Sequence, residues 1–194
     1  MKLLGEIARL QIQRSSLTIG TGPTRYFDPA ALLAVDELFL TPGGACAPAP
    51  DGSCLVDVHH AMHPCTRSRG ENTLSIGFSR HYDAMRGHFG EPFPFGCAAE
   101  NIIVEGPAPR VRLADLAAGL VIEAGEGFAS LGDVIVATPC MPFGKYALRD
   151  RDAPAVAVKS ALQFLDDGMR GFYCGFAGPK TATIRVGAKV YAAR

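Results

Sequence analysis

Apolar and polar residues alternate along several short stretches of the chain, and this alternation predicts β-strands. The clearest case is Leu74, Ile76 and Phe78, which are separated by small or polar residues, as a strand with one buried face requires. Further strands are predicted at 101–104, 119–122, 133–136, 171–176 and 183–191. Short strands separated by Gly- and Pro-containing turns are typical of a barrel or a sandwich, so the pattern predicts a mainly β (α+β) fold.

A few short helices are predicted between these strands. Ser79 is expected to cap the first helix, whose apolar residues recur at helical spacing until Gly90 ends it. A second short helix is predicted over 160–168. A capping side chain followed by proline, at Asp28, predicts a third over 30–33. The helical content is therefore expected to be local decoration of a β framework.

The composition fits a single domain over 1–194. Apolar residues make up 48% of the chain and charged residues 20%, as in ordinary globular proteins. Lys+Arg and Asp+Glu both number 19, so we expect neither nucleic acid nor membrane as a partner. The 22 glycines and 14 prolines favour many short elements joined by turns. The richest such stretch, 42–52, predicts a loop long enough to act as a lid.

Charges near the start of the chain argue against an export signal. Glu6 and Arg9 interrupt the first apolar run, and no run of 18 apolar residues occurs elsewhere, so a cytoplasmic location is expected. The six cysteines form no CxxC pair, and in that compartment we expect reduced thiols. The cysteines are Cys46, Cys54, Cys65, Cys97, Cys140 and Cys174.

Common catalytic motifs are absent from the sequence. It contains no HExxH, P-loop or GxSxG pattern, which argues against a zinc peptidase, a P-loop nucleotide hydrolase and a serine hydrolase with a nucleophile elbow. A hydrolase that uses one of the five histidines with a nucleophile not visible in the sequence remains as a third hypothesis.

Histidines and a cysteine are concentrated in 57–65. Imidazole and thiolate groups at this density suit Zn²⁺, particularly with two more cysteines just upstream. The alternative interpretation is a turn whose histidines only donate and accept hydrogen bonds. If the segment binds metal, the protein is a non-catalytic binding module with a structural zinc. The candidate zinc ligands are Cys46, Cys54, His59, His63 and Cys65.

Cys140 lies between two prolines, Pro139 and Pro142, directly after a predicted strand. Proline restricts the backbone, so the thiol is held on a stiff, extended connection. That placement suits a nucleophile, a sulfur carrier or a metal ligand, since each role needs a positioned thiolate. The alternative interpretation is a small buried apolar residue at a strand end, the common fate of free cysteine.

The order of several short motifs resembles the MOSC family, which is related to the C-terminal domain of molybdenum cofactor sulfurases. The resemblance covers 54–194, with 1–53 as a variable N-terminal part. Its motifs are His59-His60, the strand and helix over 74–89, Gly96 to Ile102 as the family's Gly-Glu-Asn turn, Gly132-Asp133, Pro139-Cys140 and Gly168 to Tyr173. Two departures are Ala137, where the family commonly has Arg, and Cys97-Ala98-Ala99, which interrupts the Gly-Glu-Asn turn.

The resemblance implies a MOSC-type, β-barrel-like domain in which Cys140 is the functional cysteine. Members of the family carry sulfur as a cysteine persulfide, delivered by a pyridoxal-phosphate-dependent desulfurase, or ligate molybdenum in a pterin cofactor, and some reduce N-hydroxylated compounds. The chain is thus expected to be a molybdenum-dependent oxidoreductase or a sulfurtransferase-like protein. Its protein partner would be a cysteine desulfurase or a redox protein, and pyridoxal phosphate is expected on the partner.

Candidate site residues follow from these motifs. Cys140 is expected to be the molybdenum ligand or persulfide carrier. His60 is a candidate catalytic proton donor. Arg67 and Arg69 have the planar guanidinium that suits a pterin phosphate. The remaining candidates, which would shape the pocket, are His59, Glu100 and Asn101.

Overall fold

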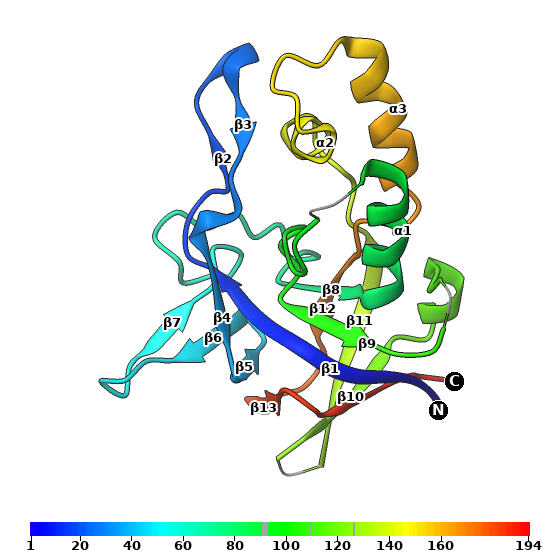
Figure 1. Cartoon of the computed structure of the whole chain (residues 1–194). Coiled ribbons are helices and arrows are strands. Elements are labelled where there is room, and N and C mark those ends of the chain that lie inside the picture. The colour runs from blue at the N-terminus through cyan, green and yellow to red at the C-terminus, as the bar shows by residue number, and fades with distance from the viewer. Residues whose placement is uncertain (91–92, 109, 126) are drawn as a thin grey trace.

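Seven strands close into a barrel in the computed structural model of the chain, which describes residues 1–90, 93–108, 110–125 and 127–194 (Figure 1). The order around the barrel is β14-β10-β11-β12-β8-β9-β1, and β1 pairs with β14 to close it. Neighbouring strands are antiparallel except β8 and β9, which are parallel. The bounds are β1 Lys2–Gln13, β8 Leu74–Phe78, β9 Ile102–Glu105, β10 Leu120–Ala124, β11 Gly127–Val136, β12 Phe172–Phe176 and β14 Lys189–Ala192. The mainly β, barrel-like prediction is confirmed.

Smaller elements surround the barrel. β4 (Leu32–Val35) pairs with β1, a second sheet has the order β13-β5-β6-β7, and β2 pairs with β3. The strand bounds are β2 Thr18–Ile19, β3 Tyr26–Phe27, β5 Glu37–Thr41, β6 Gly44–Pro48, β7 Cys54–Val56 and β13 Ala182–Arg185. The helices are α1 Ser79–Phe89, α2 Met141–Leu148 and α3 Ala155–Leu165, with 3-10 turns at Gly22–Thr24, Pro29–Ala31 and Leu113–Leu116. Among the described residues, none of the helices combines the length and the apolar character that crossing a membrane requires.

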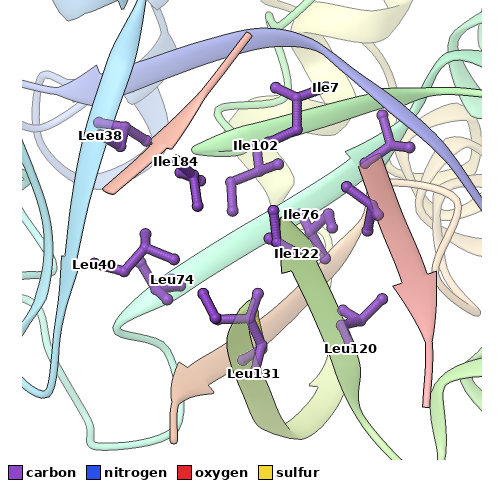
Figure 2. Close-up of a cluster of buried hydrophobic side chains, with 14 of the residues drawn as sticks. Ile7, Leu38, Leu40, Leu74, Ile76, Ile102, Leu120, Ile122, Leu131 and Ile184 are labelled. Atoms are coloured by element: carbon purple, nitrogen blue, oxygen red, sulfur yellow. The ribbon is translucent and has the colours of Figure 1, made fainter. Parts of the chain in front are cut away.

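Aliphatic side chains fill the barrel, and the second sheet covers one side of this core. Figure 2 shows Ile76, Ile102 and Ile122 from barrel strands meeting Leu38 and Ile184 from β5 and β13. A second apolar cluster lies outside the barrel, where α1, α2 and α3 pack; it contains Tyr82, Met85, Phe143 and Leu165. The cleft described below lies between these two packed regions.

The predicted strand and helix at 74–90 are present as β8 and α1. β8 is buried on both faces, because one face lines the barrel and the other packs against the turn before β9, where Ser75 bonds Asn101 and Gly77 lies against Glu100. Ser79 is the first residue of α1, so the prediction that it caps the helix was wrong. Gly90 ends the helix with a φ of 81°, a conformation that glycine adopts without strain.

Three local predictions are corrected by the structure. The helix predicted over 30–33 is a single 3-10 turn, Pro29–Ala31, capped by the Asp28 carboxylate, and the chain then enters β4 because β1 offers a free edge there. The loop and lid predicted at 42–52 contain β6, which is paired on both sides and mostly buried. The helix predicted over 160–168 begins earlier and is α3.

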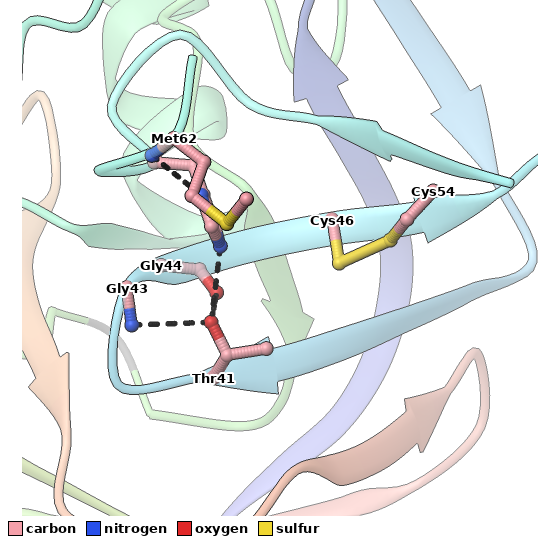
Figure 3. Close-up of a disulfide and its surroundings, with 7 residues drawn as sticks. Thr41, Gly43, Gly44, Cys46, Cys54 and Met62 are labelled. Atoms are coloured by element: carbon pink, nitrogen blue, oxygen red, sulfur yellow. Dashed lines mark hydrogen bonds between the residues drawn. A yellow bond between two sulfur atoms is a disulfide. The ribbon is translucent and has the colours of Figure 1, made fainter.

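A disulfide joins Cys46 and Cys54, so the expectation of six reduced thiols was wrong (Figure 3). The β6–β7 hairpin sets Cys46 opposite Val56 and Pro48 opposite Cys54, which brings the two cysteine Cα atoms to 5.9 Å. This separation suits a disulfide, and sequence spacing alone does not reveal it. The other four cysteines are free, with Cys65 and Cys140 exposed.

Replacing Cys54 by serine is expected to lower the free energy of unfolding by about 2–3 kcal/mol, because the open chain regains the entropy that the short loop had lost. Denaturant titration of the oxidised protein measures the change. Cys65→Ser is the matched control, since Cys65 is an exposed, free cysteine. Equal stabilities for wild type and Cys54→Ser in the absence of reductant would show that the bond does not stabilise the fold.

Candidate functional site

Cys140 is positioned by the junction between β11 and α2. Its backbone is extended, with φ −101° and ψ 156°, and its carbonyl accepts the first helical hydrogen bond from the N–H of Gly144 at 2.9 Å. Pro142 lies within the first turn of α2, where a missing N–H is tolerated. The thiol is exposed, as a reacting or ligating group requires, and the alternative of a buried apolar cysteine does not apply here.

The thiol opens into a cleft with a small inner part of about 110 Å³ and an outer part of about 590 Å³. Residues from distant parts of the chain line both parts, and the outer volume is that of an ordinary small-molecule site. The residues common to both parts are Thr18, His59, Arg67, Cys140, Arg170 and Tyr173.

Arginines dominate the charge of the cleft. Arg25, Arg67, Arg69 and Arg170 line the outer part, whereas Glu71 is the one acidic residue in that lining. Four guanidinium groups around one cavity favour an anionic ligand, and their planar geometry suits phosphate or carboxylate oxygens. The electrostatics therefore select for anions, although the protein as a whole carries no net charge.

Arg170 joins the arginine cluster to the thiol. Its Nη1 donates to the carbonyl of Thr138 at 3.2 Å, and its Nη2 faces the carbonyl of Ala98 at 3.4 Å. Burial opposes its charge, but Tyr173 and Cys140 favour it, and the net effect raises the pKa of Arg170. Its Nε is buried without a hydrogen-bond partner.

His59 is held by a buried carboxylate. Asp57 is fully buried, and its Oδ1 accepts from the His59 backbone N–H at 2.9 Å and contacts His59 Nδ1 at 3.1 Å. With Nδ1 engaged, Nε2 is the ring nitrogen left for a ligand in the cleft. The other oxygen of Asp57 accepts from the N–H of Gln13 at 2.6 Å and from Asn101 Nδ2 at 3.0 Å. Asp57 thus connects β1, the His59 turn and the start of β9.

Glu100 forms the floor of the inner part. Its Oε2 accepts a hydrogen bond from the Tyr82 hydroxyl at 2.7 Å, and that hydroxyl accepts from the N–H of Ala98 at 3.2 Å. Burial raises the pKa of Glu100 to about 7, although the bond from Tyr82 acts in the opposite direction. Glu100 therefore changes charge near neutral pH, which is common at functional sites.

The raised pKa of Glu100 predicts a pH-dependent stability. The folded state holds the Glu100 proton more tightly than the unfolded chain does, so the stability that this proton contributes is complete below the ordinary glutamate pKa of 4.5 and is lost as pH rises through about 7. The free energy of unfolding of wild type, measured relative to Glu100→Gln, is expected to fall between pH 5 and pH 8. Denaturant titrations across this range test it, with the exposed Glu105→Gln as control. A constant difference would contradict the assignment.

Two predicted site residues lie outside the cleft lining. His60 is 5% exposed and packs under the β5–β6 turn, where its Nε2 meets the Thr41 hydroxyl at 3.1 Å and its Nδ1 accepts from the N–H of Met62. Burial lowers the pKa of His60, which favours its neutral form. Asn101 is also buried, and its amide is engaged by Ser75, Gln11 and Asp57. Both residues are buried next to cleft residues, His59 and Glu100, and support the site without lining the cleft.

The candidate zinc ligands are not assembled into one cluster. Cys46 and Cys54 are bonded to each other, and His63 uses Nδ1 to accept from the backbone N–H of Cys65 at 3.1 Å. His59 faces the Cys140 cleft. Within the described ranges, no group of three or more His, Cys, Asp or Glu side chains is placed to hold a metal ion.

The cleft also contains residues that the sequence did not single out as site residues. Thr18 and Arg25 come from the N-terminal part, which was set apart as variable, and Arg170 and Tyr173 come from the segment that leads into β12. Asp57 is the first residue of the histidine-rich segment 57–65 and carries no site signal of its own in the sequence. The available signal was local: an acidic residue two positions before a histidine, and an arginine inside the closing MOSC-like motif.

The closed barrel has a MOSC-like fold, as comparison with solved structures indicates. The Bacillus subtilis YuaD protein is 16% identical, aligns over 98% of this chain and 96% of its own, and has a TM-score of 0.59. YiiM from Geobacillus stearothermophilus is 14% identical over 97% of this chain and 75% of its own, with a TM-score of 0.51. YiiM from Escherichia coli is 17% identical over 84% of this chain and 65% of its own, also with a TM-score of 0.51.

YuaD and YiiM are MOSC-domain proteins, so the fold agrees with the sequence resemblance. At these identities the likeness describes the fold. No protein-family model matches the chain, and no curated protein matches it in sequence.

Proposed function

We propose that this chain is a MOSC-type protein that binds an anionic molybdenum–pterin cofactor in the cleft, with Cys140 as the metal ligand. The observation that carries the proposal is an exposed, positioned thiol at the edge of a cavity lined by four arginines. Thiolate is a soft ligand that suits a transition metal, and guanidinium groups suit the phosphate of a pterin. The same cleft contains both kinds of group.

A second, independent observation supports the fit of the cleft residues to such a cofactor. Arg170 has a buried Nε without a partner although the rest of its guanidinium is engaged, and a buried donor of this kind is costly unless a ligand satisfies it. Arg170 also compensates for Ala137, which lines the inner part at the position where the MOSC family commonly has Arg. An arginine from another segment thereby restores a positive charge beside Cys140.

The protein's own residues then have separate tasks. Arg67 and Arg69 would hold the phosphate, and Cys140 would fix the metal. His59, oriented by Asp57, would hold or deliver a proton through Nε2. When bound, the cofactor supplies a redox-active metal, which is compatible with the reduction of N-hydroxylated compounds that the family resemblance implies.

Sulfur transfer is the second candidate function, and the exposure of Cys140 favours it. A persulfide on this thiol would be accessible to a cysteine desulfurase, and Arg170 nearby would stabilise the negative charge of the terminal sulfur. Incubation with a desulfurase and free cysteine, followed by mass spectrometry, would then detect one added sulfur on Cys140 and none on Cys65. Sulfur on both cysteines to the same extent would indicate reactivity without function.

Removing the charges of Arg67 and Arg69 tests the cofactor proposal. The double variant Arg67→Gln/Arg69→Gln is expected to retain at least ten-fold less pterin than wild type after purification from a host that makes the cofactor, because the phosphate loses two charge-assisted contacts. The matched control is Arg80→Gln, an exposed arginine on α1 outside this cleft. Equal pterin content in wild type and the double variant would contradict the assigned role.

A further inference from the structure

An apolar groove begins where the Cys140 cleft ends. α2 and α3 pack against each other beside the barrel (Figure 1). The groove is lined by residues of both helices and has a volume of about 680 Å³. Thr138 lines both the cleft and the groove, and Met141 follows Cys140 directly. The two cavities therefore adjoin the same segment, the one that presents the thiol.

Aliphatic side chains form most of the groove. Val158 and Leu162 of α3 also contact the helix backbone at Gly144, where an added Cβ would lie 3.2 Å from Leu162, so the absence of a side chain at Gly144 lets the helices approach closely. Met141 is 61% exposed at the groove, a large unburied surface for an apolar side chain. Predominantly apolar cavities of this size with a few polar groups are typical of small-molecule sites.

Charges are distributed unevenly along the groove. Lys145 and Lys159 line it on α2 and α3, whereas Asp166 lines it just after the end of α3. Arg170, four residues beyond Asp166, donates to the carbonyl of Thr138, which lines both the groove and the cleft. Two lysines and one aspartate leave the lining of the groove with a net positive charge, which favours an anionic group on a ligand that binds there.

We infer that the substrate of the Cys140 site is amphipathic: an aliphatic or aryl body lies in the α2–α3 groove, and a carboxylate or similar anion lies at Lys145 and Lys159. This inference rests on the proposed function, because it assigns the cleft arginines to the cofactor and leaves the lysines to the substrate. It names a substrate class, amphipathic acids, from the shape and charge of the groove.

The test measures binding of dodecanoate to the full-length protein by isothermal titration calorimetry. Saturable binding is expected, and Met141→Glu should weaken it at least ten-fold, because a negative charge is then placed in an apolar groove that binds an acid. Met141 is largely exposed, and an acidic residue in the first turn of a helix is favourable, so the variant is expected to fold. Lys145→Ala/Lys159→Ala should weaken binding of dodecanoate and leave binding of dodecanol unchanged.

Val156→Glu is the matched control, since Val156 is a 77% exposed apolar residue of α3 that does not line the groove. It should bind dodecanoate as wild type does. Absence of saturable binding, or equal weakening by Val156→Glu, would overturn the inference. A wild-type dimer that Met141→Glu converts to monomers would also overturn it, because the groove would then be covered by a second copy.

The groove proposal and the cofactor proposal can be refuted separately. Cys140→Ser should lose pterin and still bind dodecanoate, and Met141→Glu should lose dodecanoate and still retain pterin. Dodecanoate binding in a protein that never acquires pterin would refute the proposed function while leaving the groove as a site for amphipathic acids. Pterin retention without dodecanoate binding would refute only the groove.

Discussion

Replacing Asp57 by alanine is expected to lower the free energy of unfolding by about 3–5 kcal/mol, the largest effect of any single change considered. The carboxylate is fully buried and accepts from the backbone N–H groups of Gln13 and His59 and from Asn101 Nδ2. Alanine would leave these buried donors without an acceptor and would also free the His59 ring. Chemical denaturation measures the change.

Asp51→Ala provides the comparison for Asp57. Asp51 also accepts hydrogen bonds two residues ahead, from Ser53, but it lies in an exposed hairpin turn where water replaces the lost bonds. The exposed variant should retain nearly all of the stability. If both variants unfolded at the same denaturant concentration as wild type, the buried network around Asp57 would not support the fold as described.

Replacing Gly77 by alanine is expected to cost about 1–3 kcal/mol of stability and to displace Glu100, because there is no space for a methyl group at this position. An ideal Cβ on Gly77 would overlap the Glu100 side chain, which is itself confined by Gly171 and by its bond to Tyr82. The side chain therefore cannot move away without breaking that bond. Denaturant titration measures the stability.

Gly175→Ala is the matched control for Gly77→Ala. Gly175 lies in β12, close to β8 in the barrel, and an added Cβ there would meet no atom within 4 Å. The free energy of unfolding of Gly175→Ala should remain within about 0.5 kcal/mol of the wild-type value. Identical behaviour of the two variants would show that Glu100 does not need the space left by Gly77.

Features with a strong local signal could be predicted from the sequence. The alternation at 74–78 and the helical spacing that follows it were sufficient for β8 and α1, because neighbouring residues determine both periodicities. The two prolines around Cys140 were sufficient to predict a stiff, extended connection, but they left a presented thiol and a buried apolar cysteine as alternatives, and only the structure shows that Cys140 is exposed. The mainly β class followed from the frequency of turn residues.

Features that depend on distant partners could not be predicted. β1 lacks a clear alternation because it pairs with three strands and its register shifts between Leu3 and Gly5 and again between Ile7 and Arg9. α2 was missed because Pro142 reads as a helix breaker, although it lies in the first turn. Cys46, Cys54 and Arg170 are visible in the sequence, but only the fold shows which group each of them contacts.

Metal and pterin content per chain is the most direct test of the central claim that Cys140 holds the cofactor. The protein is purified from a host that makes molybdenum cofactor, and molybdenum is measured by mass spectrometry and pterin by fluorescence. Wild type and Cys65→Ser should contain close to one of each per chain. Cys140→Ser should contain neither, while its stability stays within about 1 kcal/mol because the thiol is exposed. Equal molybdenum and pterin in wild type and Cys140→Ser, or neither in wild type, would contradict the account.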